Sequence, residues 1–186
     1  VELEAGAPVY QGDVLETGGQ GSIEITFIDG TAFTIGEEAR MVLDELVYDP
    51  ATNTGSSSFS VVQGVFSFVS GAIAKTGSDA MTVRTPVATI GIRGTQVAVH
   101  AAAEGEENVI TLLQEEGGIT GEIVVSNSGG TQVLNQAFAT TTIASFFVTP
   151  TVPIILPEAQ VHQMFGGAVE ALQTNIQGRE ARQQER

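Results

Sequence analysis

The sequence predicts an all-β domain of short strands, followed by an extended apolar segment and one amphipathic helix. Short runs of alternating residues, separated by turn residues at intervals of roughly 8–12, are typical of sandwiches, barrels and β-solenoids. The chain also combines 22 glycines with a charged fraction of only 16%, a balance typical of many-turned β-proteins. With 42% hydrophobic residues among 186, it can bury one substantial core. We expect a solenoid-like or sandwich-like form.

The β-domain is predicted over residues 1–136, and its clearest hairpin spans residues 21–36, "GSIEITFIDGTAFTIG". Apolar and polar residues alternate on both sides of a central turn, as expected for strands with one buried face. Asp29 and Gly30 at that turn are predicted to supply the positive φ values of a tight two-residue connection. The segment therefore predicts two paired strands at the start of the domain.

Residues 81–100, "MTVRTPVATIGIRGTQVAVH", have an apolar alternation that changes parity around Pro86 to Gly91. A one-residue offset sends side chains to the opposite face, so a bulge or corner is predicted there. Gly91 and Gly94 permit backbone shapes that other residues avoid. Arg93 is predicted to be largely buried, where its five donors tie the corner's carbonyls together or pair with one acid. Capture of a ligand by Arg93 is the alternative.

The C-terminal part changes character after residue 136. Residues 137–157 are apolar and rich in Thr and Pro, which predicts a strand or extended connector and no membrane span. Residues 158–178 have helical spacing of apolar side chains, and 179–186 read as a solvated tail. These apolar surfaces either pack on their own β-domain or contact another subunit. The interaction candidates are Ile143, Phe146, Phe147, Val148, Val161, Phe165, Leu172 and Ile176.

The composition argues against several classes of function. A net charge of −15 repels nucleic acid and anionic lipid. There are no cysteines, and His100 and His162, the two histidines, have no nucleophile motif beside them, so no enzyme is predicted. The acidic stretches 37–38, 44–46 and 104–108 lack the spacing of a calcium loop and could bind calcium only weakly. No cofactor is expected.

The segment "VRTPVATIGIRGT" resembles the most diagnostic part of FecR-type domains, which have a T-P-x-A-x-x-x-[VI]-R-G-T core. Upstream, "VYQGDVLETGGQGSIEITFIDGTAFTIG" and "VVQGVFSFVSG" are similar to the family's opening strands, and the resemblance covers about residues 1–136. The residues predicted to form the structural motif are Thr85, Pro86, Ala88, Gly91, Arg93, Gly94 and Thr95.

The resemblance implies a bacterial, extracytoplasmic, solenoid-like β-domain at the cell surface, in the periplasm or outside the cell. Two functions stay open. One is a non-enzymatic structural protein that self-associates into a homo-oligomer, polymer or filament through its C-terminal arm and helix. The alternative is a periplasmic sensor of the anti-sigma-regulator type, as in the members that gave the family its name. Fold and compartment transfer more safely than the signalling role.

Overall fold

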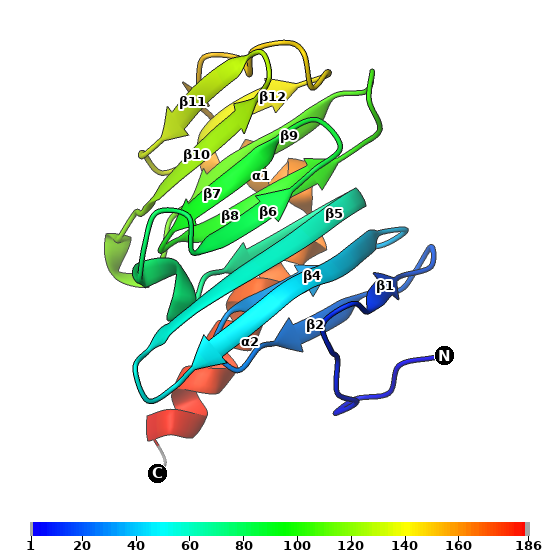
Figure 1. The fold of residues 1–186 in the computed structure, drawn as a ribbon. Coiled ribbons are helices and arrows are strands. Elements are labelled where there is room, and N and C mark those ends of the chain that lie inside the picture. The colour runs from blue at the N-terminus through cyan, green and yellow to red at the C-terminus, as the bar shows by residue number, and fades with distance from the viewer. Residues whose placement is uncertain (1, 185–186) are drawn as a thin grey trace.

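The computed structural model describes residues 2–184, which form one curled, half-barrel sheet of 13 strands with helices at the C-terminal end (Figure 1). The strands are β1 (Val14–Glu16), β2 (Ile23–Thr26), β3 (Ala32–Ile35), β4 (Arg40–Asp49), β5 (Thr54–Val69), β6 (Met81–Arg84), β7 (Thr89–Arg93), β8 (Gln96–Ala101), β9 (Asn108–Leu113), β10 (Glu122–Asn127), β11 (Gly130–Leu134), β12 (Ala139–Ile143) and β13 (Ile154–Ile155). The helices are η1 (Ile73–Lys75), η2 (Glu116–Gly118), α1 (Glu158–Phe165) and α2 (Gly167–Gln184).

The long strand β5 belongs to both halves of the curled sheet. Its first half pairs with β4 and β6, and this half, layer A, continues to β1 on one side and through β7 and β10 to β11 on the other. Its second half pairs with β3 and β8, and this half, layer B, ends at β2 and β13. The predicted β class is confirmed. Because only the β5–β6 pairing is parallel among the described strands, the arrangement differs from the stacked coils of a solenoid.

The transfer of β5 between the layers takes place at Gly64. The pairing of β5 with β4 ends at Gln63, the pairing with β8 begins at Gly64, and the φ of Gly64 is +100°. A Cβ atom there would lie 2.5 Å from the Cβ of Ala39. Only glycine satisfies both the backbone conformation and the close approach, so this residue fixes how one layer folds over the other.

The hydrophobic core lies between the two layers. Phe33 and Phe68 of layer B stack with ring centroids 4.8 Å apart, and Phe59 of layer A lies 4.9 Å from Phe33. All three side chains are fully buried. The alternation in the first hairpin therefore marks its buried face correctly. Its turn differs from the prediction, because Gly30 has a positive φ of 88° and Asp29 does not.

Helices α1 and α2 lie against the outer face of layer B, behind the sheet in Figure 1. Val161, Phe165 and Val169 form a second apolar cluster with side chains of β8 and β9. The Ser67 hydroxyl donates a buried 2.6 Å hydrogen bond to the Ala168 carbonyl oxygen. No helix in the described part of the chain is long and apolar enough to span a membrane.

The C-terminal helical region differs from the single helix predicted over 158–178. Gly166, with a φ of +49°, separates α1 from α2, because this conformation suits glycine and interrupts a helix. Residues 179–184, predicted as a solvated tail, continue α2. The remaining tail residues, 185–186, lie outside the described residues.

Candidate functional site

The Thr-Pro motif forms the hairpin turn between β6 and β7. The Thr85 hydroxyl oxygen accepts hydrogen bonds from the amides of Val87 at 3.2 Å and Ala88 at 3.1 Å, while the Thr85 amide donates to the Ala88 carbonyl. Pro86 occupies a position in this turn that needs no ladder donor. Val87 and Ala88 point into the core. The change of parity in the sequence therefore corresponds to a tight hairpin turn between β6 and β7.

The Arg-Gly-Thr part of the motif carries the chain from layer A to layer B. β7 ends at Arg93 and β8 begins at Gln96, so Gly94, with a φ of +69°, lies at the crossover. The Thr95 amide donates to the Ser70 hydroxyl at 2.8 Å, and the Ser70 amide donates to the Thr95 carbonyl. This reciprocal pair fixes the crossover.

Arg93 makes the predicted pair with one acid but is far less buried than predicted. Its guanidinium pairs with the Glu122 carboxylate on the neighbouring strand β10, and 45% of its side-chain surface is exposed. The predicted burial is therefore wrong. Gly91 has no positive φ, and a Cβ there would meet no atom closer than 3.6 Å. Nothing in the local backbone demands glycine at that position.

A loop over residues 144–151 bridges the two layers on the side where β11 and β12 lie, the closed side. The Asn127 side chain at the end of β10 is its anchor. Its amide nitrogen faces the carbonyl oxygens of Val87 at 3.2 Å, Ser145 at 3.1 Å and Val148 at 2.8 Å. The loop is thereby tied both to layer A and to the Thr-Pro turn.

The same loop presents Phe146, Phe147 and Val148, here called the Phe knob, to solvent. Phe147 is 76% exposed, and its ring lies edge-on to that of Phe146 with centroids 5.6 Å apart. The Phe146 amide donates to the Glu104 carboxylate at 2.9 Å. Hydrogen bonds from the Ser145 side chain and this amide hold the pKa of Glu104 below its ordinary value. Two exposed rings thus sit on a well-anchored backbone.

The other predicted interaction residues lie mostly inside the chain's own fold. Ile143, Val161, Phe165 and Leu172 are each no more than 3% exposed, and Ile176 is half-buried. Their apolar surface already has a partner in the described chain. These four residues are therefore unavailable for contact with another subunit unless the C-terminal elements detach.

The segment predicted as a strand or extended connector, 137–157, contains two strands of layer B. β12 pairs with β9, and β13 pairs with β12 through Ala139 opposite Ile155 and Thr140 opposite Ile154. The arm therefore adds to the edge of its own sheet. Pro153 immediately before β13 limits further pairing, because proline lacks a backbone donor.

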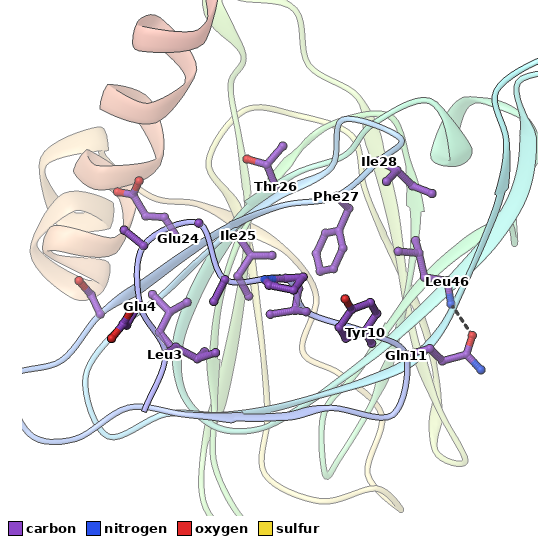
Figure 2. A pocket seen from close by; sticks show the side chains of 17 residues that line it. Leu3, Glu4, Tyr10, Gln11, Glu24, Ile25, Thr26, Phe27, Ile28 and Leu46 are labelled. Atoms are coloured by element: carbon purple, nitrogen blue, oxygen red, sulfur yellow. Dashed lines mark hydrogen bonds between the residues drawn. The ribbon is translucent and has the colours of Figure 1, made fainter. Parts of the chain in front are cut away.

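A groove of about 970 Å³ lies on the opposite side, the open side, between the N-terminal segment and β2 (Figure 2). Its apolar lining includes Leu3, Tyr10, Phe27 and Ile28, and Glu4 and Glu24 border it. One hydrogen bond from the Leu46 amide to the Gln11 side chain, 3.2 Å long, helps to hold the segment. Backbone bonds between Gly12, Asp13 and Leu43 continue this attachment.

The sequence interpretation missed the role of Asp29. Its carboxylate is buried and accepts hydrogen bonds from the Thr31 amide at 3.0 Å, the Thr31 hydroxyl at 2.8 Å and the Ile73 amide at 3.3 Å. It ties the first hairpin to η1. The sequence shows Asp29, Gly30 and Thr31 side by side, but nothing in their spacing indicates that Asp29 also binds the amide of Ile73 in η1.

Within residues 2–184, no group of three or more His, Cys, Asp or Glu side chains is placed to hold a metal ion. His162 lies 3.7 Å from the Glu158 carboxylate one helical turn away. The features that stand out are the two sides of the half-barrel, one with an exposed aromatic knob and one with a groove. The knob is apolar and exposed, and the groove has an apolar lining with carboxylates at its border.

The curled two-layer sheet, its Thr-Pro hairpin and its Arg-Gly-Thr crossover define an all-β domain of the FecR type. A family model described as FecR protein matches residues 13–116, more than half of the chain. The chain belongs to the FecR family, and the resemblance predicted from the motif is confirmed.

Two crystal structures of a candidate anti-sigma factor from Parabacteroides distasonis are similar in fold. Their TM-scores are 0.59 and 0.58, with 14% sequence identity in both cases. The alignments cover 80% of this chain and 62% of that protein, so this chain spans less than two thirds of it. At this identity the likeness shows the fold alone. No curated protein matches the chain.

Proposed function

We propose that the chain is the extracytoplasmic, non-enzymatic interaction domain of a bacterial signalling regulator. The family match over residues 13–116 carries the proposal. The fold likeness to a candidate anti-sigma factor supports it, although it covers only part of that protein. The Phe knob is consistent with a binding role, because exposed aromatic side chains are typical anchors of protein contacts.

The architecture suits a rigid binding module. β5 runs through both layers, so one continuous strand connects them. The motif turn at Thr85 is joined to the closed-side loop through Asn127. In this proposal the domain binds a partner on the closed side, and the rest of the regulator converts binding into altered sigma-factor activity.

The second candidate is self-association into a homo-oligomer or polymer. It is favoured by the exposed apolar side chains of the charge-free segment 146–155, which include Phe147, Val152 and Ile154. It is weakened because Val161 and Leu172, which the sequence assigned to the same contact, are buried in the chain itself. Sedimentation velocity at high protein concentration, in salt and calcium, separates a stable monomer from an assembling chain.

The signalling proposal is tested in the bacterium that encodes the chain. The coding region for residues 2–184 is deleted in frame, and transcripts are compared with those of the parent strain. We expect altered transcription of genes that share one sigma-factor promoter sequence. Unchanged transcription, together with loss of a surface polymer in electron micrographs, would contradict signalling and favour assembly.

A further inference from the structure

The Phe knob is joined to an acidic loop between β8 and β9. The Gly105 amide donates to the Ala144 carbonyl oxygen at 2.8 Å, and the Glu104 carboxylate accepts the Phe146 amide. These two bonds place the exposed carboxylates of Glu106 and Glu107 on the segment that flanks the knob. An apolar and an anionic element are thereby held together as one surface.

The knob is held rigidly from its other flank as well. The Phe146 carbonyl oxygen accepts hydrogen bonds from the Ser128 amide at 3.1 Å and hydroxyl at 2.9 Å. A Cβ at Gly129 would lie only 2.4 Å from the Thr149 amide nitrogen, so the two backbones touch there. The rings are therefore presented without the ordering cost that a mobile loop pays on binding.

The charges around the knob favour a cationic partner. Ion pairs among the described residues include Arg40 with Glu16, Arg93 with Glu122 and His162 with Glu158, and none of these three involves the acidic loop. The net charge of −15 extends the negative field over the whole chain. Arg84, the last residue of β6, precedes the Thr-Pro turn on the layer A side.

We propose that the Phe knob and the acidic loop form a docking surface for a folded protein that offers an apolar pocket bordered by Lys or Arg side chains. This rests on the proposed signalling function, since the partner belongs to that signalling system. A symmetric contact with a second copy would bring like charges together. An anionic membrane surface would be repelled for the same reason.

The test places the photo-crosslinking residue p-benzoylphenylalanine at position 147 of the full-length protein in its own bacterium. A matched control places it at Ile28, which is 72% exposed on the open side. We expect a single protein adduct from position 147 that is absent from the control. Adducts to a second copy of the chain, to lipid, or to no molecule at all would overturn the proposal.

The protein identified by the crosslink is then purified and its affinity measured. Phe147→Ala is expected to weaken binding about 30-fold, the effect of an aromatic hot spot. The double variant Glu106→Lys, Glu107→Lys is expected to lower the association rate and its salt dependence. Ile28→Ala should leave affinity within about twofold. The proposal would be overturned if Phe147→Ala left the affinity unchanged. It would also be overturned if neither salt concentration nor the double variant changed the binding.

The transcript measurement keeps the two proposals separable. A position-147 adduct and a Phe147-dependent affinity, with transcription unchanged on deletion of the domain, would refute the signalling function and leave the docking surface standing. Transcription that responds to deletion of the domain but not to Phe147→Ala, with no adduct at position 147, would refute the docking surface and leave the signalling function standing. Circular dichroism confirms that each variant is folded.

Discussion

The two sides of the half-barrel are sealed by different means. On the closed side, the loop over 144–151 bridges the layers through hydrogen bonds that converge on Asn127. On the open side, the chain itself crosses between the short edge strands β1 and β2, where the Thr17 hydroxyl donates to the Gly36 carbonyl oxygen at 2.6 Å, and the N-terminal segment lies over a groove of about 970 Å³. Because β5 joins the layers only along its own length, each side of the curled sheet must be closed separately.

The difference also explains where exposed apolar side chains occur. Tyr10 is exposed at the open side, on the N-terminal segment, which few hydrogen bonds attach to the sheet edge. Phe147 is exposed at the closed side on a backbone held by several bonds. An exposed apolar side chain on a loosely attached segment is explained by incomplete closure of the sheet at that side. An exposed aromatic side chain on a firmly hydrogen-bonded loop suggests a surface formed for contact.

The largest predicted effect on thermal stability comes from shortening the chain at its C-terminal end, compared with shortening it at its N-terminal end. Ending the chain after Asn135 removes β12, whose buried Ala139, Thr141 and Ile143 complete layer B, together with the helices. We expect this variant to lose cooperative thermal unfolding. Removing residues 1–12 instead should leave a folded domain, because most core residues remain. Circular dichroism melts of both variants measure the contrast.

This truncation also tests the domain boundary predicted at residue 136. The structure continues layer B beyond that boundary, through β12 and β13. A sharp, reversible melt of the chain ending at Asn135 would show that residues 1–135 are self-sufficient and that the closed side contributes little to folding.

A point substitution at each side gives the second prediction. Asn127→Ala removes the side-chain donor of the Val87 and Val148 carbonyl oxygens, while the Ser145 carbonyl oxygen keeps the Val148 amide, and we expect it to lower the free energy of unfolding by about 2–4 kcal/mol. Gln11→Ala removes one exposed 3.2 Å bond and should cost below about 1 kcal/mol. Urea unfolding measures both. Equal losses would contradict the contrast between the sides.

The strand pattern and the motif could be predicted from the sequence because both depend on local residue order. Alternation marked the buried face of the first hairpin, and the parity change predicted a bulge or corner close to the hairpin turn that begins at Thr85. The environments of Arg93 and Asp29 depend on segments distant in the chain, Glu122 on β10 and Ile73 in η1. Short-range spacing contains no information about these partners.

The C-terminal helices show a second limit of sequence reasoning. Apolar side chains at helical spacing predict a buried face, which Val161, Phe165 and Leu172 provide. The same spacing is expected whether the face packs on its own sheet or on another subunit. Only the tertiary arrangement distinguishes the two, and it places these side chains within the chain itself.

The third prediction concerns pH at the closed side. Hydrogen bonds from Ser145 and the Phe146 amide hold the pKa of Glu104 below its ordinary value of 4.5. A lowered pKa means that this carboxylate stabilises the fold above pH 4.5, and that the contribution is lost as pH falls through the lowered pKa. The Phe146 amide shift, followed by NMR, should titrate with a midpoint below 4.5.

Two comparisons control this titration. Glu104→Gln should abolish the low-pH step at the Phe146 amide. Burial raises the pKa of Glu115 despite the opposing charge of Lys75, so its protonation should begin at higher pH and add stability as pH falls. A Phe146 amide that titrates at or above the ordinary value would show that the Glu104 contact does not persist in solution.

The smallest change in the free energy of unfolding is expected for Arg93→Ala. Arg93 lies away from the closing loop and the groove, so this variant is the reference for the variants at the two sides. Its pair with Glu122 joins β7 to β10 on the exposed face of layer A, with 45% of the Arg93 side chain exposed. Exposed pairs contribute about 0.2–1 kcal/mol, so Arg93→Ala, Glu122→Ala and the double variant should yield a coupling energy in that range by urea unfolding. A loss of about 3 kcal/mol or more in Arg93→Ala would mean that the arginine holds the crossover as a buried charge would. Asn127→Ala and Arg93→Ala would then lower the free energy of unfolding by similar amounts. The loss in Asn127→Ala could no longer be attributed to closure of the closed side.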